Sequence, residues 1–151
     1  MMYHQVVRRI IQGAFRHLNQ HNPEQVVAMF APTLIHSFAG ESALGGVRSS
    51  PETSIQWYQR LFRLFPDLRF KVNSIVIAGQ PWDTRAAIQF RVELTPPYGG
   101  HYSNEVAQFI RIRWGRITEL YLYEDTHKLE GLLSQMAQAG IAEAAAAPIV
   151  G

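Results

Sequence analysis

Residues 84–95 read TRAAIQFRVELT, and this stretch decides the fold because its side chains alternate cleanly in polarity. One face is apolar and the other is largely polar: Ala86, Ile88, Phe90, Val92 and Leu94 against Arg85, Ala87, Gln89, Arg91 and Glu93. An alternation of period two predicts a half-buried β-strand, since successive side chains point to opposite faces of a sheet. The polar face either meets water or lines a cavity, and a cavity would give its paired base and acid a function.

Three more segments of the C-terminal half also have strand character, and turn residues separate them. Together with 84–95 they make four predicted strands, at residues 68–78, 84–95, 101–113 and 116–124. The turns are Gly79-Gln80-Pro81, Pro96 to Gly100 and Trp114-Gly115. Segments of this kind, joined by short turns, predict an antiparallel meander.

Helical spacing dominates the N-terminal half. A helix is predicted over 5–20, and a short second helix opens at an Asn22 cap and stops before Pro32. A candidate strand over 34–38 and a Gly/Ser-rich loop over 39–49 follow, the loop being either a lid or an ordinary connection. A third helix runs from Ser50 to Pro66, and a last one from Asp125 or Thr126 to Gly140.

Helices followed by a meander predict the α+β class. We expect a cone-shaped α+β barrel, in which N-terminal helices pack in a strongly curved antiparallel sheet and a C-terminal helix follows. Residues 1–140 would form a single domain. The Ala-rich tail, 141–151, would extend over the surface or onto a partner subunit.

The composition is that of an ordinary globular protein, with 47% hydrophobic and 17% charged residues in 151. The net charge of +2 is too small to favour nucleic acid as a partner. No apolar run is long enough to span a bilayer, so no membrane partner is expected. The absence of cysteine excludes disulfides and thiolate chemistry and fits a cytoplasmic location.

Several motifs carry a resemblance to a known family. Trp114-Gly115-Arg116-Ile117-Thr118-Glu119 is followed at alternate positions by Tyr121, Tyr123 and Asp125, and Gly40, Leu44-Gly45-Gly46 and Phe65-Pro66-Asp67-Leu68 precede it. With the order of elements over 5–139, these residues resemble the nuclear-transport-factor-2-like superfamily, in its SnoaL-like polyketide cyclase branch. The resemblance implies the cone fold. It leaves the reaction open, because this fold hosts isomerases, hydrolases, cyclases and plain binding modules.

Catalytic candidates follow from the resemblance. Arg91-Val92-Glu93 resembles the Arg-x-Asp pair of limonene-epoxide hydrolases, which implies Glu93 as base or water anchor and Arg91 as its orienter. The second Asp of those enzymes is matched by Leu122, so the triad is incomplete. His36 stands on the strand where the isomerases carry a proton-abstracting Asp. Against these readings, the pair could be a solvated surface ion pair and His36 a hydrogen-bonded core residue.

The resemblance also implies a set of ligand-facing residues. Beyond the catalytic candidates, these are Phe15, Leu18, Trp57, Tyr58, Tyr102, Asn104, Val106, Gln108, Leu122 and Glu124. Amides and a phenol in an apolar wall suit a small apolar ligand that is cyclic or carries a carbonyl. No spacing of His, Asp and Glu favours a metal, and no cofactor is expected.

Two functions remain open for the cone. The first is cofactor-free acid/base chemistry, as in an isomerase, a cyclase, or a hydrolase or dehydratase. The second is a ligand-binding or dimeric assembly module without turnover. In either case we expect a homodimer through the outer sheet face, formed by Tyr121, Tyr123 and the apolar face of 84–95.

Overall fold

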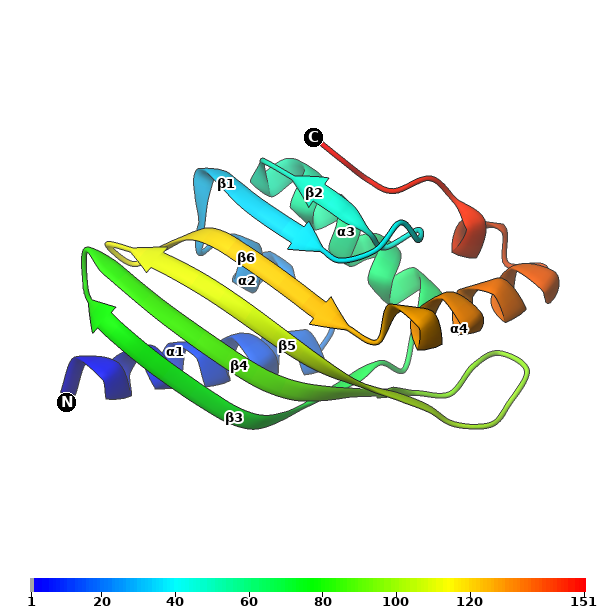
Figure 1. The fold of residues 1–151 in the computed structure, drawn as a ribbon, viewed down its shortest axis with the longest axis horizontal. Helices are drawn as coiled ribbons and strands as arrows, with labels where there is room; N and C mark the ends of the chain where they lie inside the picture. The colour runs from blue at the N-terminus through cyan, green and yellow to red at the C-terminus, as the bar shows by residue number, and fades with distance from the viewer. Residues whose placement is uncertain (1) are drawn as a thin grey trace.

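The computed structural model describes residues 2–151, and Figure 1 shows its course. In chain order the elements are α1 (Met2–Asn19), α2 (Glu24–Val27), β1 (Phe30–Phe38), β2 (Gly46–Arg48), α3 (Pro51–Leu64), β3 (Arg69–Gln80), β4 (Asp83–Leu94), β5 (Tyr102–Arg113), β6 (Arg116–Glu124), α4 (Thr126–Gln138) and the 3₁₀ helix η1 (Ala142–Ala145). This is the predicted α+β class, in which α1, α2 and α3 precede the strands β3 to β6 and α4 follows them.

The six strands form one curved sheet in the order β2-β1-β6-β5-β4-β3. From β3 to β6 the sheet is the predicted antiparallel meander. The prediction of a wholly antiparallel sheet is wrong at one place, because β1 pairs with β6 in parallel. The connection from β1 to β6 crosses over through α3 and the other strands, and such a crossover allows a parallel pair. The sheet does not close, since β2 and β3 are its two edges.

Three local predictions are corrected around β1 and β2. The second helix ends at Val27, and the strand begins at Phe30 and runs through Pro32. Pro32 is tolerated there because the register between β1 and β6 is irregular between Phe30 and Ile35, so the ladder does not need its missing N–H. The loop 39–49 contains strand β2, which pairs with β1. Asn22 is not the cap of α2; Pro23 holds that position without a side-chain hydrogen bond.

Two predicted caps are confirmed. The Ser50 hydroxyl accepts from the N–H of Thr53 at the start of α3. The Asp125 carboxylate accepts from the N–H of Lys128 at the start of α4. Both bonds satisfy one of the N–H groups that a helix N-terminus leaves free, and they fix where each helix begins beside the sheet.

The core fills the space between the concave face of the sheet and the helices. In Figure 1, α1 crosses below β3 and β4, while α3 lies behind β1 and β2. Ile88 and Phe90 of β4 point into this space and meet Val7, Ile11 and Phe15 of α1 in one hydrophobic cluster. Within residues 2–151, no helix is long and apolar enough to cross a membrane.

The C-terminal tail, predicted to extend over the surface or onto a partner subunit, packs against its own chain. In Figure 1 the tail folds back from α4 and ends beside β2. Gly151 donates its N–H to the Val47 carbonyl and accepts from the Ser49 N–H, at 3.2 and 3.0 Å. The tail thus extends the β2 edge of the sheet.

Candidate functional site

A cavity of about 250 Å³ lies inside the cone between α1, α2, α3 and the sheet. The three helices and the sheet all contribute to its wall. The apolar faces of the helices and alternate residues of β4, β5 and β6 point inward. The residues that line it include Tyr3, Val6, Val7, Ile10, Ile11, Ala14, Phe15, Leu18, Trp57, Tyr58, Leu61, Phe90, Gln108, Ile110, Trp114, Leu120 and Leu122. We call this space the main cavity.

Few polar groups reach the main cavity. Gln108 is the amide in its lining, on β5 opposite Ile88 and Leu122 in the two neighbouring strands. Burial raises the pKa of the Tyr58 phenol, so this hydroxyl stays protonated at neutral pH. The Tyr3 hydroxyl is already engaged with Thr84. Among the described residues 2–151, no carboxylate, histidine or arginine lines this cavity.

The predicted pair Arg91 and Glu93 lies outside the cone, so of the two alternatives for the polar face of β4 the structure shows the one in which it meets water. Their side chains are 46% and 40% exposed, and Arg91 Nε lies 3.7 Å from Glu93 Oε1. A second carboxylate, Glu105 Oε1 on β5, lies 3.6 Å away from the same nitrogen. The reason is curvature: the concave face takes the apolar residues Ile88 and Phe90, and the convex face keeps the charges.

His36 is buried behind the cavity wall. Its Nδ1 lies 3.0 Å from Ser54 Oγ and accepts from Arg48 Nε at 3.2 Å. Because Nδ1 accepts, the ring proton sits on Nε2, a buried nitrogen without a hydrogen-bond partner. Burial, and then the Arg48 charge, lower the His36 pKa well below its ordinary value. His36 is therefore a neutral ring packed between Trp57 and Tyr58, outside the lining of the main cavity.

Arg48, which the sequence reading did not select, is fully buried beside His36. Its guanidinium donates to the carbonyls of Gly45, Gly46 and Ile149, at 2.8 to 3.2 Å, and lies over the Trp57 ring. Burial lowers the Arg48 pKa to about 10, which leaves the cation intact at neutral pH. Nothing in the sequence distinguishes Arg48 from a surface arginine, since its carbonyl partners come from two distant segments.

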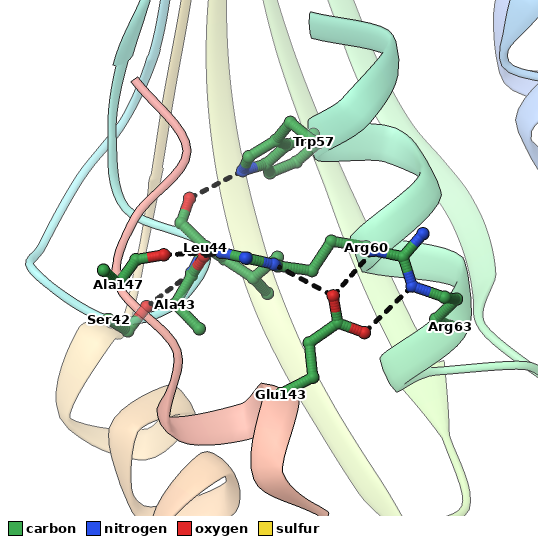
Figure 2. Close-up of polar contacts among 8 residues, drawn as sticks. All are labelled: Ser42, Ala43, Leu44, Trp57, Arg60, Arg63, Glu143 and Ala147. Atoms are coloured by element: carbon green, nitrogen blue, oxygen red, sulfur yellow. Dashed lines mark hydrogen bonds and ion pairs between the residues drawn. The ribbon is translucent and has the colours of Figure 1, made fainter. Parts of the chain in front are cut away.

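The loop 39–49, predicted to be either a lid or an ordinary connection, is held by side chains of α3, as Figure 2 shows. Trp57 Nε1 donates to the Leu44 carbonyl at 2.7 Å. Arg60 donates to the carbonyls of Ala43 and Ala147, at 2.9 and 2.7 Å. The Glu143 carboxylate receives both Arg60 and Arg63, the latter at 2.6 Å. Helix α3 thus clamps the loop and the C-terminal tail together, and we call this region the closed end.

A second, smaller cavity of about 40 Å³ lies toward the closed end. It shares Trp57, Leu61, Phe70, Phe90 and Leu122 with the main cavity, so these side chains form the partition between the two. A space of this size holds about one water molecule. Tyr102, Val106 and Glu124 line it on the sheet side.

Glu124 is the strongly perturbed acid of the interior. Burial, followed by the nearby Asp125 charge, raises its pKa to about 8, and its Oε2 is buried without a hydrogen-bond partner. Burial also raises the pKa of the Tyr102 phenol. Asn104 donates to the Tyr102 hydroxyl at 2.9 Å and to the Asp125 carbonyl at 3.0 Å. A carboxyl that titrates near neutrality is a candidate proton donor or acceptor.

The predicted ligand-facing residues divide between the two cavities. Phe15, Leu18, Tyr58 and Gln108 line the main one, Tyr102, Val106 and Glu124 line the smaller one, and Trp57 and Leu122 line both. Asn104 lines neither, because its amide is used in holding Tyr102 and the start of α4. Among residues 2–151, no three His, Cys, Asp or Glu side chains converge in the way a metal site requires.

Comparison with known proteins places this fold and cavity in a class. The model of the SnoaL-like domain matches residues 11–120, and the chain belongs to the SnoaL-like family. The superfamily resemblance drawn from the sequence is thereby confirmed. No curated protein sequence matches the chain.

Solved structures with the same fold share little sequence with the chain. An NTF2-like protein of unknown function from Burkholderia pseudomallei is 15% identical, covering 83% of this chain and 95% of its own, with a TM-score of 0.72. IdmH from Streptomyces antibioticus, a proposed polyketide cyclase, is 22% identical over 82% and 95%, with a TM-score of 0.67. A ketosteroid isomerase-like protein of Catenulispora acidiphila is 17% identical over 85% and 92%, with a TM-score of 0.68. At these identities the likeness establishes the cone fold.

Proposed function

We propose that the protein binds a small apolar molecule, cyclic or carbonyl-bearing, in the main cavity. The observation that carries the proposal is the wall itself, which is apolar apart from Gln108 and a few hydroxyl and indole groups. An apolar cavity of about 150 Å³ holds benzene. A cavity of about 250 Å³ is therefore suited to a molecule of roughly two fused rings.

Gln108 gives the cavity its polar recognition. It is buried, and its place on the central part of β5 sets its amide among Ile88, Ile110 and Leu122. An amide can donate to a ligand carbonyl or accept from a ligand hydroxyl, and the neutral Tyr58 phenol can do either as well. One oriented oxygen on an otherwise apolar ligand satisfies this wall.

The test is a binding titration with a hydrophobic fluorescent probe, together with native mass spectrometry of the purified protein. Ala14→Phe fills the cavity from α1 and should lower probe affinity at least about tenfold, since the displaced volume is that of a ring. Gln12→Phe, on the exposed side of the same helix, is the matched control and should bind as wild type. Equal probe affinity in both variants would show that the cavity is not the binding site.

A second function, cofactor-free acid/base catalysis, is supported by Glu124. One oxygen of its carboxyl, Oε2, is buried without a hydrogen-bond partner, and Glu124 and the partition residues line the smaller cavity together. A ligand that displaced Phe90 or Leu61 from this partition would bring its reacting carbon or oxygen toward Glu124. The carboxyl could then move a proton in an isomerisation, cyclisation or hydration. Arg91, Glu93 and His36 are not part of this proposal because they lie outside both cavities.

The catalytic proposal is tested on a ligand identified by the binding experiment. Glu124→Gln should abolish turnover and leave binding within about threefold, while the wild-type rate should titrate with a pKa near 8. Glu93→Gln, which changes an exposed carboxylate, is the control and should keep the wild-type rate. A bound ligand that no condition converts would leave the protein a binding module.

We also propose that the protein is a homodimer that packs through the convex face of the sheet. The apolar face of 84–95, which was expected to form this contact, is instead buried in the core. The exposed apolar residues of the convex face are Val76, Phe109 and Tyr123, and they surround hollows floored by the small residues Ala87 and Ala107. Light scattering should give twice the 17.1 kDa chain mass. Phe109→Arg should reduce this mass to that of one chain, because it sets a charge in the centre of the face. A wild-type monomer would refute the dimer.

A further inference from the structure

Exposed apolar side chains lie at one end of the main cavity: Val6, Ile10 and Trp114 line it, and Met2 and Trp82 are the chain neighbours of the lining residues Tyr3 and Pro81. These exposed side chains are Met2, Val6 and Ile10 of α1, Trp82 in the β3–β4 turn and Trp114 in the β5–β6 turn, and we call them the apolar rim. The two indoles are the most conspicuous members, at 57% and 73% exposure. Figure 1 shows both turns and the start of α1 at the same end of the molecule, away from the C-terminal tail. We call this the open end.

The rim is a built feature, since the two turns are tied to each other. The N–H of Trp114 donates to the Pro81 carbonyl at 2.7 Å, and the rings of Trp82 and Trp114 lie 6.2 Å apart. Trp114 has a φ of 49° and Gly115 a φ of 79°. Asn-Gly is the pair that such a turn favours, and a bulky side chain in the left-handed region is strained. The large indole is present despite that cost to the fold.

Positive charge surrounds the apolar rim. Arg9 lies three residues after Val6 on α1, and therefore beside it, while Arg113 and Arg116 flank the Trp114 turn. None of these arginines takes part in the ion pairs found within residues 2–151. The one carboxylate in these turns, Asp83, is already bound by Arg111 at 2.9 Å and lies 3.5 Å from Arg85. The open end is thus both apolar and cationic.

We propose that the apolar rim docks on the surface of an anionic lipid bilayer, from which the main cavity takes its ligand. Tryptophan prefers the boundary between headgroups and acyl chains, and arginine near that boundary is attracted to anionic headgroups. Docking would place the mouth of an apolar cavity against an apolar phase, so that a water-insoluble ligand could enter without crossing water. The inference rests on the proposed ligand binding.

Two earlier statements about the molecule are compatible with this contact. No membrane partner was expected from the sequence, because no apolar run is long enough to span a bilayer. Within residues 2–151 no helix could cross a membrane, but docking at a surface needs no such helix. The convex face proposed for dimerisation is formed by Val76, Phe109 and Tyr123 and does not include the rim. A dimer would carry two rims.

The test is partition onto vesicles of phosphatidylcholine and phosphatidylglycerol, followed by flotation and by tryptophan emission. The emission of Trp82 and Trp114 should shift to shorter wavelength on binding, whereas Trp57, at 2% exposure, is already buried and contributes a constant signal. Pure phosphatidylcholine and high salt should both weaken binding, since each arginine is worth about fivefold at an anionic surface. Protein that stays with the soluble fraction on anionic vesicles would overturn the proposal.

Variants separate docking from ligand binding. Arg9→Gln with Arg113→Gln should lower vesicle partition about twentyfold and leave probe binding in solution unchanged, because neither residue lines the cavity. Trp82→Gln should lower partition about tenfold by removing one inserted indole. Arg69→Gln and Tyr98→Gln, exposed residues near the other end of the sheet, are the matched controls.

Each result decides one question. Loss of vesicle binding in the rim variants alone, with probe binding retained, supports the proposal. Vesicle binding lost equally in the Arg69 and Tyr98 controls would overturn it, because the attraction would then be general. Light scattering could also show an assembly larger than a dimer, which the Trp82 variant no longer forms. This result would overturn the proposal, because the rim would then contact a second copy of the chain.

Discussion

The two ends of the cone differ in which side chains they bury and which they expose. At the closed end, polar groups are buried: Arg48, His36 and Glu124 lie inside, and Trp57 turns its N–H to a backbone carbonyl. At the open end, apolar groups are exposed: Trp82 and Trp114 stand in water around the cavity mouth. Ordinary folding energetics would favour neither arrangement, because burial of polar groups and exposure of apolar ones both cost free energy.

The Arg48 and Trp57 side chains of the closed end are covered by the rest of the chain, and the indoles of the open end are exposed. The Arg48 guanidinium and Trp57 indole find their partners within the chain, in the loop 43–46 and the tail. The indoles at the open end have no such cover, and Trp114 holds a strained backbone conformation besides. We therefore regard the closed end as a structural clamp and the open end as the surface that meets something else.

The largest effect should come from the clamp. Trp57→Ala removes a buried indole, opens the partition between the cavities and leaves the Leu44 carbonyl without its donor. The free energy of unfolding should fall by about 4 kcal/mol, measured by urea denaturation. Trp82→Ala at the open end should change it by less than about 0.5 kcal/mol. Similar losses in both variants would erase the contrast between the ends.

An intermediate effect should appear in the pH dependence of stability. The folded pKa of Glu124, about 8, lies above its ordinary value of 4.5, so protonated Glu124 favours the folded state. This contribution is complete below the unfolded pKa and is lost as pH rises from 4.5 through 8. Relative to wild type, Glu124→Gln should therefore gain stability as the pH rises, by about 3 kcal/mol at pH 7.

The measurement for Glu124 is the difference in unfolding free energy between wild type and variant at a series of pH values. This difference removes the contributions of the other acids, such as Asp83 and Glu143, whose pKa values are lowered by their arginine partners. A difference that stays constant across the range would show that Glu124 is solvated and that the closed end does not bury this carboxyl.

The smallest effect should come from the strained turn at the open end. Trp114→Asn places a residue that tolerates the left-handed region before Gly115, as this turn type favours. Stability should rise by about 0.5 to 1 kcal/mol, which thermal unfolding can resolve. Trp82→Asn, at a residue outside the positive-φ set, should give no such gain. A loss of stability in Trp114→Asn would mean that the indole supports the fold.

The helices, the strands and their apolar faces could be predicted from the sequence alone. Alternation in 84–95 and the helical stripe over 5–20 specify which side chains are apolar on one side, and folding buries that side whatever the details. The caps Ser50 and Asp125 and the Trp114-Gly115 turn were also readable, because each depends on bonds within a few residues. The resemblance to a known family added the cavity-facing positions Phe15, Leu18 and Gln108, which line the main cavity.

Which polar side chains are buried depends on the tertiary structure and could not be predicted from the sequence. Arg91 and Glu93 lie on the convex face and Arg48 in the core, although Arg91 and Glu93 stand in a half-buried strand and Arg48 in a Gly/Ser-rich loop segment. The direction of sheet curvature decides the first case, and the meeting of two distant segments, 45–46 and 149, decides the second. Curvature and long-range closure depend on the packing of the whole chain, so no local pattern records them. The apolar rim has the same origin, because its residues come together only when two hairpin turns and a helix end at one mouth.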